Sequence, residues 1–275
     1  MGRVTTTDRR TALRMSAAGV LAPLAAGCAS TKADGPGSSA RTAPPGTGGV
    51  SATPSPGASA RARHHAPAPG PRRFPGLPEQ IERGPAGRPR IALTFHGRGT
   101  PATARALLAE AERADARITV LAVGTWLDEY PALARRVLDG GHELGNHTQR
   151  HLDINALPRD GARAEIADCA RRLRRLTGAP GTWFRPSRTR RASPLVAALA
   201  RAEGYPHVLS YGVDSLDHTS PGPAAVVRTV AARAAPGAVV SLHFGYPGTV
   251  AALPALLDEL ARRGLKAVTT TELLS

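Results

Sequence analysis

The chain has 275 residues and a formal net charge of +15, and only 4% of its residues are aromatic. Residues 1–74 hold 10 Lys or Arg and 2 Asp or Glu, so +8 of the charge lies there and +7 lies in residues 75–275. A nucleic-acid-binding protein typically gathers basic residues on one face beside aromatic side chains, and this composition argues against that class. We expect the basic charge to favour an anionic cell envelope instead.

Residues 1–28 are predicted to be an export signal. Arg9 and Arg10 form a twin-arginine pattern, and the apolar run that follows, residues 15–29, is shorter than the roughly 20 residues that span a bilayer. Leu24-Ala25-Ala26-Gly27-Cys28 resembles a bacterial lipobox, in which Cys28 is lipidated and becomes the mature N-terminus. Cleavage without lipidation is the alternative. The protein is therefore expected on the outer face of the cytoplasmic membrane, held through a lipid anchor only, or secreted.

Residues 29–75 are rich in Pro, Ser, Ala and Gly. Such a segment cannot bury enough apolar surface to offset the chain entropy that folding would cost. We expect a disordered tether that its prolines keep extended, followed by one domain over residues 76–275.

Apolar runs and amphipathic segments alternate along this domain. The pattern predicts strands at residues 91–95, 118–123, 142–145, 182–184, 208–209, 213–215, 238–243 and 266–268. It predicts helices at residues 101–114, 131–138, 160–177, 194–203, 223–234 and 250–262, and a last turn at 271–274. Repeated strand–helix units give parallel strands, and seven or eight of them indicate an α/β fold, an irregular (β/α) barrel.

The only cysteine besides Cys28 is Cys169, on the helix predicted at residues 160–177. Its spacing from Ile166 and Leu173 places it on the apolar stripe of that helix. With Cys28 lipidated, Cys169 has no partner for a disulfide. We expect a buried apolar side chain rather than a reactive thiol.

His147 and His151 lie four residues apart, directly after a predicted strand. In one helical turn such a pair lies on one face, so both imidazoles could reach a single divalent ion. The spacing alone is a weak signal, and two solvated loop histidines are the alternative.

Five sequence blocks, in order, resemble the motifs of the polysaccharide deacetylase family, the NodB-homology domain. The resemblance covers roughly residues 90–275. The block around the histidine pair, His147-Thr148-Gln149-Arg150-His151, resembles the family's His-(Ser/Thr)-x-x-His motif. The other four are Thr94-Phe95-His96-Gly97, Trp183-Phe184-Arg185-Pro186-Ser187-Arg188, Asp214-Ser215-Leu216-Asp217-His218 and Val239-Val240-Ser241-Leu242-His243. The family fold is an irregular (β/α) barrel, which agrees with the strand–helix pattern.

The resemblance implies a role for each matching residue. His147 and His151 match the two metal histidines, and the divalent metal, expected to be zinc, polarises the acetyl carbonyl and lowers the pKa of water. His243 matches the general acid that protonates the departing amine, and Asp217 matches the carboxylate that holds this histidine charged and oriented. Arg185 matches the arginine that positions the base. Arg188, through its backbone N–H, and Asp214 are assigned to substrate binding.

The first block departs from the family pattern. The family has Asp-Asp, which supplies the base and the third metal ligand, where this chain has His96 and Gly97. One hypothesis is an active deacetylase of an N-acetylated or O-acetylated envelope glycan such as peptidoglycan, with His96 as third metal ligand or as the base. The alternative is a wall-glycan binding or scaffold lipoprotein without turnover, in which His96 is a relic. We expect Gly97 to adopt a backbone conformation closed to other residues, which would let His96 turn toward the metal.

Overall fold

The computed structural model describes residues 67–275. The predicted signal, Cys28 and most of the predicted tether lie outside these residues. The last residues of the predicted tether do not: Phe74 is buried and stacks on Trp183, with ring centroids 5.5 Å apart. The Phe74 backbone N–H also donates to His207 Nε2 at 2.9 Å. The packed part of the chain thus begins before residue 76.

Eight strands and eight α-helices form within the described residues. The strands are β1 (Gln80–Ile81), β2 (Arg90–Gly97), β3 (Thr119–Ala122), β4 (Glu143–Asn146), β5 (Val208–Leu209), β6 (Val213–Asp214), β7 (Val239–His243) and β8 (Lys266–Val268). The helices are α1 (Pro101–Arg113), α2 (Gly124–Glu129), α3 (Ala132–Asp139), α4 (Arg159–Thr177), α5 (Pro194–Ala202), α6 (Pro223–Ala231), α7 (Pro247–Arg262) and α8 (Thr270–Leu274). Two short 3-10 turns are η1 (Ile154–Ala156) and η2 (Asp217–Thr219).

Six strands form one sheet around the central strand β2. Its order is β4-β3-β2-β7-β6, with β8 also beside β2, and all of its pairs are parallel. β1 and β5 pair in parallel as a second, two-stranded sheet. Single bridges from Phe184 to Asn146 and to Val208 join the two sheets, and Arg83 bridges to Ala238 on the other side. The predicted α/β fold is confirmed, as a distorted barrel that single bridges complete.

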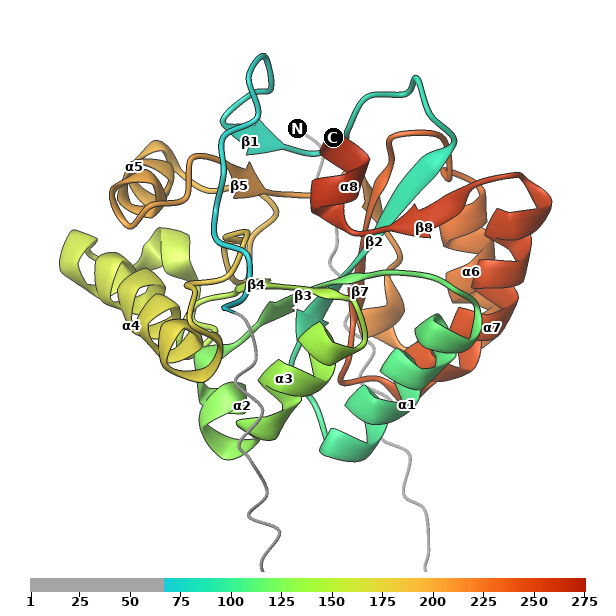
Figure 1. The fold of residues 1–275 in the computed structure, drawn as a ribbon, viewed down its shortest axis with the longest axis horizontal. Coiled ribbons are helices and arrows are strands. Elements are labelled where there is room, and N and C mark those ends of the chain that lie inside the picture. The colour runs from blue at the N-terminus through green and yellow to red at the C-terminus, as the bar shows by residue number, and fades with distance from the viewer. Residues whose placement is uncertain (1–66) are drawn as a thin grey trace, which may run out of the picture. The chain divides into compact units, whose positions relative to one another are not determined.

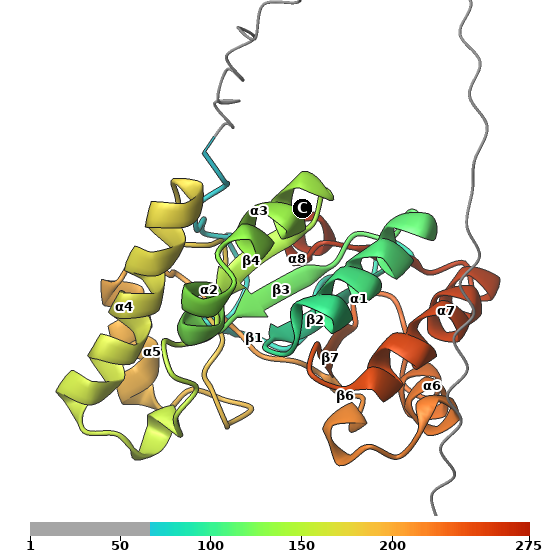
Figure 2. The same cartoon turned by 90° about the horizontal axis from the view of Figure 1, so that it is seen from below.

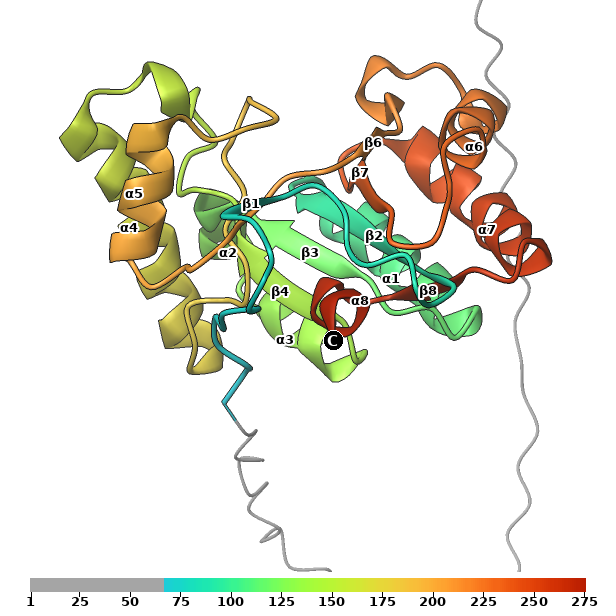
Figure 3. The same cartoon turned by 90° about the horizontal axis from the view of Figure 1, so that it is seen from above.

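The helices cover the outside of these strands. Figures 1 and 3 show α4 and α5 on one side of the sheet and α6 and α7 on the other. In Figure 2, α1 lies next to α7 and α3 lies close to α4, and the contacts between these helices agree. The interior of β2, Ile91 to Phe95, is completely buried, because side chains pack on both of its faces. Among the described residues, no helix combines the length and the apolar character that a membrane span requires.

Local signals fix several helix ends. Thr100 caps α1 by accepting a hydrogen bond from the Thr103 N–H, and α4 ends at Gly178 in the left-handed region with φ 85°. Cys169 lies fully buried on α4 as predicted, and burial raises the pKa of its thiol.

Three elements differ from the prediction. β1 was not predicted, because a strand of two residues shows no alternation of apolar and polar side chains. α2 follows β3 almost directly and has no side-chain cap, so nothing in the sequence marks its start. The strand predicted at residues 182–184 contributes only the bridges of Phe184.

Candidate active site

The predicted site residues gather at one edge of the sheet. β2, β4, β6 and β7 are parallel, so their carboxyl ends meet there. His96 and His243 lie at the ends of neighbouring strands and are direct partners in the register of β2 and β7. His147 follows the end of β4, and Asp214 ends β6. These residues therefore lie at or directly after the carboxyl ends of their strands.

His147 and His151 lie in a loop after β4, not on a helical turn as the spacing suggested. The loop closes through two residues in the left-handed region, Thr148 (φ 68°) and His151 (φ 59°). The Thr148 N–H donates to Asn146 Oδ1 at 2.9 Å, and the His151 N–H donates to Thr148 Oγ1 at 3.2 Å. Left-handed backbone at a residue other than glycine costs on the order of 1 kcal/mol, and such strain is concentrated at functional sites.

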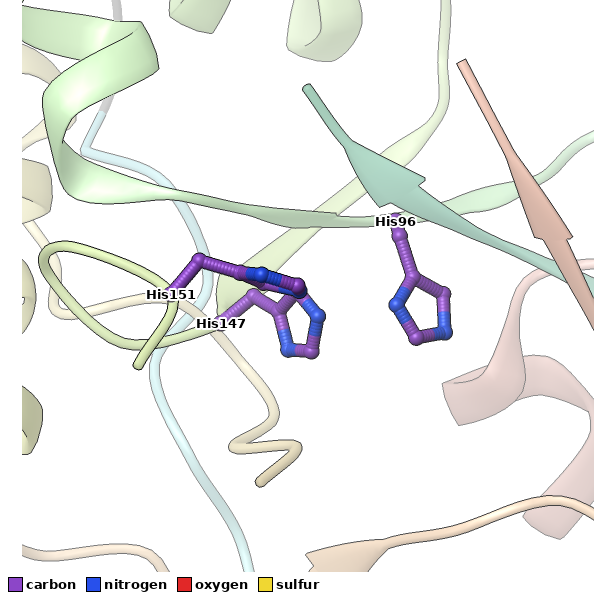
Figure 4. A group of neighbouring side chains, drawn as sticks. All are labelled: His96, His147 and His151. Carbon is purple, nitrogen blue, oxygen red and sulfur yellow. The ribbon is translucent and has the colours of Figure 1, made fainter. Parts of the chain in front are cut away.

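His96, His147 and His151 form a cluster, and we call it the three-histidine cluster. One ligand nitrogen from each lies within 4.8 Å of the others. The ring centroid of His147 lies 4.4 Å from that of His96 and 4.8 Å from that of His151. Figure 4 shows a ring nitrogen of His96 turned toward the other two imidazoles.

His96 and His147 each use one ring nitrogen in a hydrogen bond, and every ring of the cluster keeps at least one nitrogen free. His147 Nδ1 lies 3.1 Å from the Arg185 carbonyl oxygen, which only accepts, so Nδ1 carries the proton and Nε2 keeps its lone pair. His96 Nε2 is 3.0 Å from Ser241 Oγ, which leaves Nδ1. His147 Nε2 and His151 Nδ1 are buried without a hydrogen-bond partner. Buried polar atoms of this kind need a partner, and three imidazole nitrogens suit a divalent ion such as zinc.

The three imidazoles are held neutral. Burial is the largest cause, and it lowers the pKa of His96 and of His147 well below the ordinary value, with the neighbouring histidines adding to the effect. Burial, followed by the positive charges of Arg98 and Arg188, lowers the pKa of His151 to about 4. A metal ligand must be deprotonated, so the cluster is ready for an ion at neutral pH.

His243 is fixed by Asp217, as the resemblance implied. His243 Nδ1 is 2.7 Å from Asp217 Oδ1, and the His243 backbone N–H donates to Oδ2 at 2.8 Å. Thr249 Oγ1 donates to the same Oδ2 at 2.7 Å. Burial raises the pKa of Asp217, but the hydrogen bonds from His243 and Thr249 outweigh it and leave the pKa below its ordinary value. The ionised carboxylate therefore orients the His243 ring. The centroid of this ring lies 4.2 Å from that of His96.

A second group of potential ligands, Asp217, His218 and His243, is less suited to a metal. Both oxygens of Asp217 already accept hydrogen bonds, and His243 Nδ1 is one of the donors. Only the remaining nitrogens of the two histidines are left, and His218 is exposed. The contacts of this group hold the His243 ring in place and leave few free ligand atoms for an ion.

Arg185 is fully buried beneath the cluster but makes no hydrogen bond to His96 among the described residues. Its Nε donates to the Leu209 carbonyl at 3.0 Å, and Nη2 donates to Thr94 Oγ1 at 2.8 Å and the Ser210 carbonyl at 3.0 Å. Nη1 is buried without a partner, and burial lowers the pKa of Arg185 to about 9. The guanidinium thus lacks the acidic neighbour that an aspartate at position 96 would supply.

Gly97 does not provide a bend, and the expectation that its backbone freedom swings His96 inward is wrong. β2 continues through Gly97, which pairs with Ala122 and is not among the residues with positive φ. A Cβ at this position would lie 2.9 Å from Val120 Cγ1 and 3.0 Å from Ala122 Cα. Strand alternation alone directs His96 into the site, and position 97 faces β3.

The cluster opens into a cleft of about 760 Å³. Arg188 and Asp214, both predicted to bind substrate, line it, and Arg188 has left-handed backbone with φ 57°. The other lining side chains are those of His96, Arg98, His151, Thr189, Arg190, Tyr211, His218, His243 and Tyr246.

Two contributors were not predicted as site residues. Ser241, which belongs to the block that ends at His243, contacts His96, and Thr249 completes the Asp217 contacts. Ser241 lies two residues before His243 on β7, so strand alternation could have placed it on the same face. Thr249 lies at the start of α7, and nothing in the sequence links it to Asp217.

Comparisons with known proteins identify the family. A model of polysaccharide deacetylases matches residues 83–208. The chain is 32% identical over 188 residues to a peptidoglycan-N-acetylglucosamine deacetylase of Bacillus cereus, covering 67% of this chain and 87% of that protein. The chain belongs to the polysaccharide deacetylase family. This family comprises hydrolases that act on carbon–nitrogen bonds other than peptide bonds. A chitooligosaccharide deacetylase of Sinorhizobium fredii is 29% identical over 206 residues, covering 67% of this chain and 91% of the relative.

Two solved structures with similar folds concern a deacetylase-like protein without activity and its mutant. A CE4 family pseudoenzyme from Bacillus anthracis is 25% identical with a TM-score of 0.67, covering 72% of this chain and 70% of that chain. A mutant of that pseudoenzyme with restored enzymatic activity gives 26% identity and a TM-score of 0.68, with 72% of each chain covered. The similarity therefore extends to both inactive and active members of the deacetylase family.

The pH dependence of stability follows from the pKa of His151. Its pKa is about 4 in this deacetylase fold against an ordinary value of 6.5, so between these values only the unfolded chain takes up the proton. In the metal-free protein, the contribution of His151 to the free energy of unfolding should be fully present above pH 6.5. It should decrease as the pH falls toward 4. Urea unfolding between pH 7.5 and 4 measures it. His151→Asn should make the decrease smaller and leave the part that His96 and His147 contribute, whereas His218→Asn, at an exposed position, should leave it unchanged. Equal curves for parent and His151→Asn would contradict the assignment.

Proposed function

We propose that this protein is a metal-dependent hydrolase that removes N-acetyl or O-acetyl groups from a cell-envelope polysaccharide. The observation that carries the proposal is the three-histidine cluster beside the His243–Asp217 pair, at the base of one cleft. Relatives that act on peptidoglycan N-acetylglucosamine and on chitooligosaccharides support an N-acetylated glycan as the substrate.

His96, His147 and His151 would hold the ion, which we propose to be zinc. Three neutral histidines with an open position are a common catalytic zinc set. When bound, the ion would polarise the acetyl carbonyl and lower the pKa of water. Burial lowers the pKa of His96 well below the ordinary value, which makes its imidazole a weak base at neutral pH. The ligand role of His96 is therefore favoured over the base role.

His243 would donate the proton that the departing amine needs. Its Nδ1–H is engaged by Asp217 Oδ1, which leaves Nε2 for the substrate side. The Arg188 backbone N–H is proposed to stabilise the negative charge that develops on the carbonyl oxygen. His243 lines the cleft, so a glycan bound there has access to the ring.

A glycan-binding protein without turnover is the second candidate. The similarity to a pseudoenzyme supports it, as does the absence of an acidic partner for the buried Arg185 among the described residues. In that case the cleft would bind a glycan, and His96 would be a relic held by Ser241.

The role of His96 is decided by metal binding. His96→Ala should weaken zinc binding by more than about 100-fold, because loss of a ligand exceeds the ten- to hundred-fold cost of losing an outer partner. Ser241→Ala should cost about tenfold, since it removes only such a partner. Isothermal titration calorimetry measures both, with His218→Ala as a matched control. Parental affinity in His96→Ala would exclude the three-histidine site. A residual acetate-release rate in that variant would then identify His96 as a relic rather than the base.

The role of His243 is decided by turnover. His243→Ala should lower the rate of acetate release by about 10²–10⁴-fold, because the leaving amine loses its proton donor. Bound zinc should remain unchanged, since Asp217 holds the ring outside the three-histidine cluster. Asp217→Asn should also lower the rate while keeping the metal. Loss of zinc in His243→Ala would make this residue a ligand and would undo the proposal for it.

We also propose that the protein is exported by the twin-arginine route and anchored as a lipoprotein. Cys28→Ser should release it from membranes into the medium, because no lipid can be attached at that position. Replacing Arg9 and Arg10 with Lys should block export. Fractionation and immunoblotting measure both. A Cys28→Ser protein that stays fully in the membrane fraction would rule out the anchor.

A further inference from the structure

Two arginines at the cleft have no ionic partner. The side chains of Arg98 and Arg188 line it and are exposed, and neither forms an ion pair or a side-chain hydrogen bond within residues 67–275. We call them the arginine pair. Arg190, the third arginine of the lining, differs because its Nη2 lies 3.2 Å from Glu82 Oε2. The positive charge of the arginine pair is therefore available to a ligand.

The cleft offers little negative charge against this pair. Asp214 is the only acidic residue of its lining, and Asp214 Oδ1 already accepts a hydrogen bond from the Leu216 N–H at 3.0 Å. Positions 96 and 97, where the deacetylase family has two aspartates, carry His and Gly. With Arg190 paired to Glu82, the lining holds two unpaired arginines against one aspartate, so the basic side chains outnumber the acidic one.

The arginine pair lies close to the reacting groups. Both side chains line the same cleft as His96 and His151, two members of the three-histidine cluster. Arg98 follows His96 by two residues, and Arg188 follows Arg185 by three. A group bound by the pair therefore lies beside an acetamide placed at the cluster, on the same sugar or on the next one.

We propose that the arginine pair selects an anionic glycan, one that carries a carboxylate or phosphate group beside the acetylated amine. Guanidinium groups bind both anions through paired, charge-assisted hydrogen bonds. The positive cleft also attracts such a polymer before contact. A neutral N-acetylated glycan leaves both arginines unpaired. The inference names the substrate class of the proposed function, but glycan binding tests it without turnover.

The test measures binding of three oligosaccharides to the full-length protein at low ionic strength. They are neutral chitotetraose, a tetrasaccharide of alternating N-acetylglucosamine and N-acetylmuramic acid, which carries carboxylates, and a chitotetraose phosphorylated on one sugar. At least one anionic ligand should bind about tenfold more tightly than the neutral one, the low end of what a charge-assisted hydrogen bond contributes. The two anionic ligands distinguish a carboxylate from a phosphate. Methyl esterification of the carboxylates should remove the advantage of the carboxylate ligand.

Variants connect the effect to the arginine pair. Arg98→Gln and Arg188→Gln should each reduce the preference for the anionic ligand about tenfold. Arg233→Gln is the matched control, because it removes one exposed arginine outside the cleft lining and should keep the preference.

The outcomes separate the inference from the proposed function. Equal affinity for all three glycans, or an equal loss in Arg233→Gln, would overturn the inference even if acetate is released. Charge-selective binding that depends on Arg98 and Arg188 would uphold it even if no glycan is deacetylated, and the proposed activity alone would then fail.

Discussion

The parallel pairing of β2 with β7 is the constraint on which the rest of the site depends. It sets Thr94 beside Ser241 and His96 beside His243, so one register brings a candidate metal ligand and a candidate proton donor to the same edge. Because side chains alternate along a strand, the residues two positions earlier support this arrangement from below. Thr94 accepts a hydrogen bond from Arg185, and Ser241 contacts His96. A slip of β2 by one residue would turn the His96 imidazole away from His243 and into the packed layer of helices.

The site carries less negative charge than one with the family's two aspartates at positions 96 and 97. With His96 and Gly97 in the first block, no acid within residues 67–275 forms an ion pair with the buried Arg185, whose Nη1 has no hydrogen-bond partner there. Burial and the surrounding cations favour neutral imidazoles, and neutral imidazoles are the form that binds zinc. Burying a charged group usually requires a compensating partner, so Arg185 is held by carbonyl oxygens and by Thr94 instead. The same lack of acid leaves Arg98 and Arg188 without partners at the cleft.

The sequence predicted the regular elements and the family blocks well, because both depend on local patterns. The strands β5 and β8 have the predicted bounds, and the longer helices start or end within a few residues of the prediction. It failed where spatial neighbours decide the structure. The helical-turn model for His147 and His151 missed a loop that is stabilised by Asn146 and by left-handed backbone. The supposed bend at Gly97 ignored the pairing of that residue with β3, and the contact between Thr249 and Asp217 joins residues 32 apart in the chain.

The stacking of Phe74 on Trp183 fixes where the first described residues join the domain. Phe74 packs in one cluster with Ala92, near the start of β2, and with Leu273 of α8, whereas His96 lies at the other end of β2. Arg72 also bonds to Ser275 next to it. The chain thus enters the domain at the end of the strands opposite the cleft. Residues 72–74 therefore pack at the end of the sheet opposite the cleft, and none of them lines it, so the first described residues leave the glycan-facing end of β2 free.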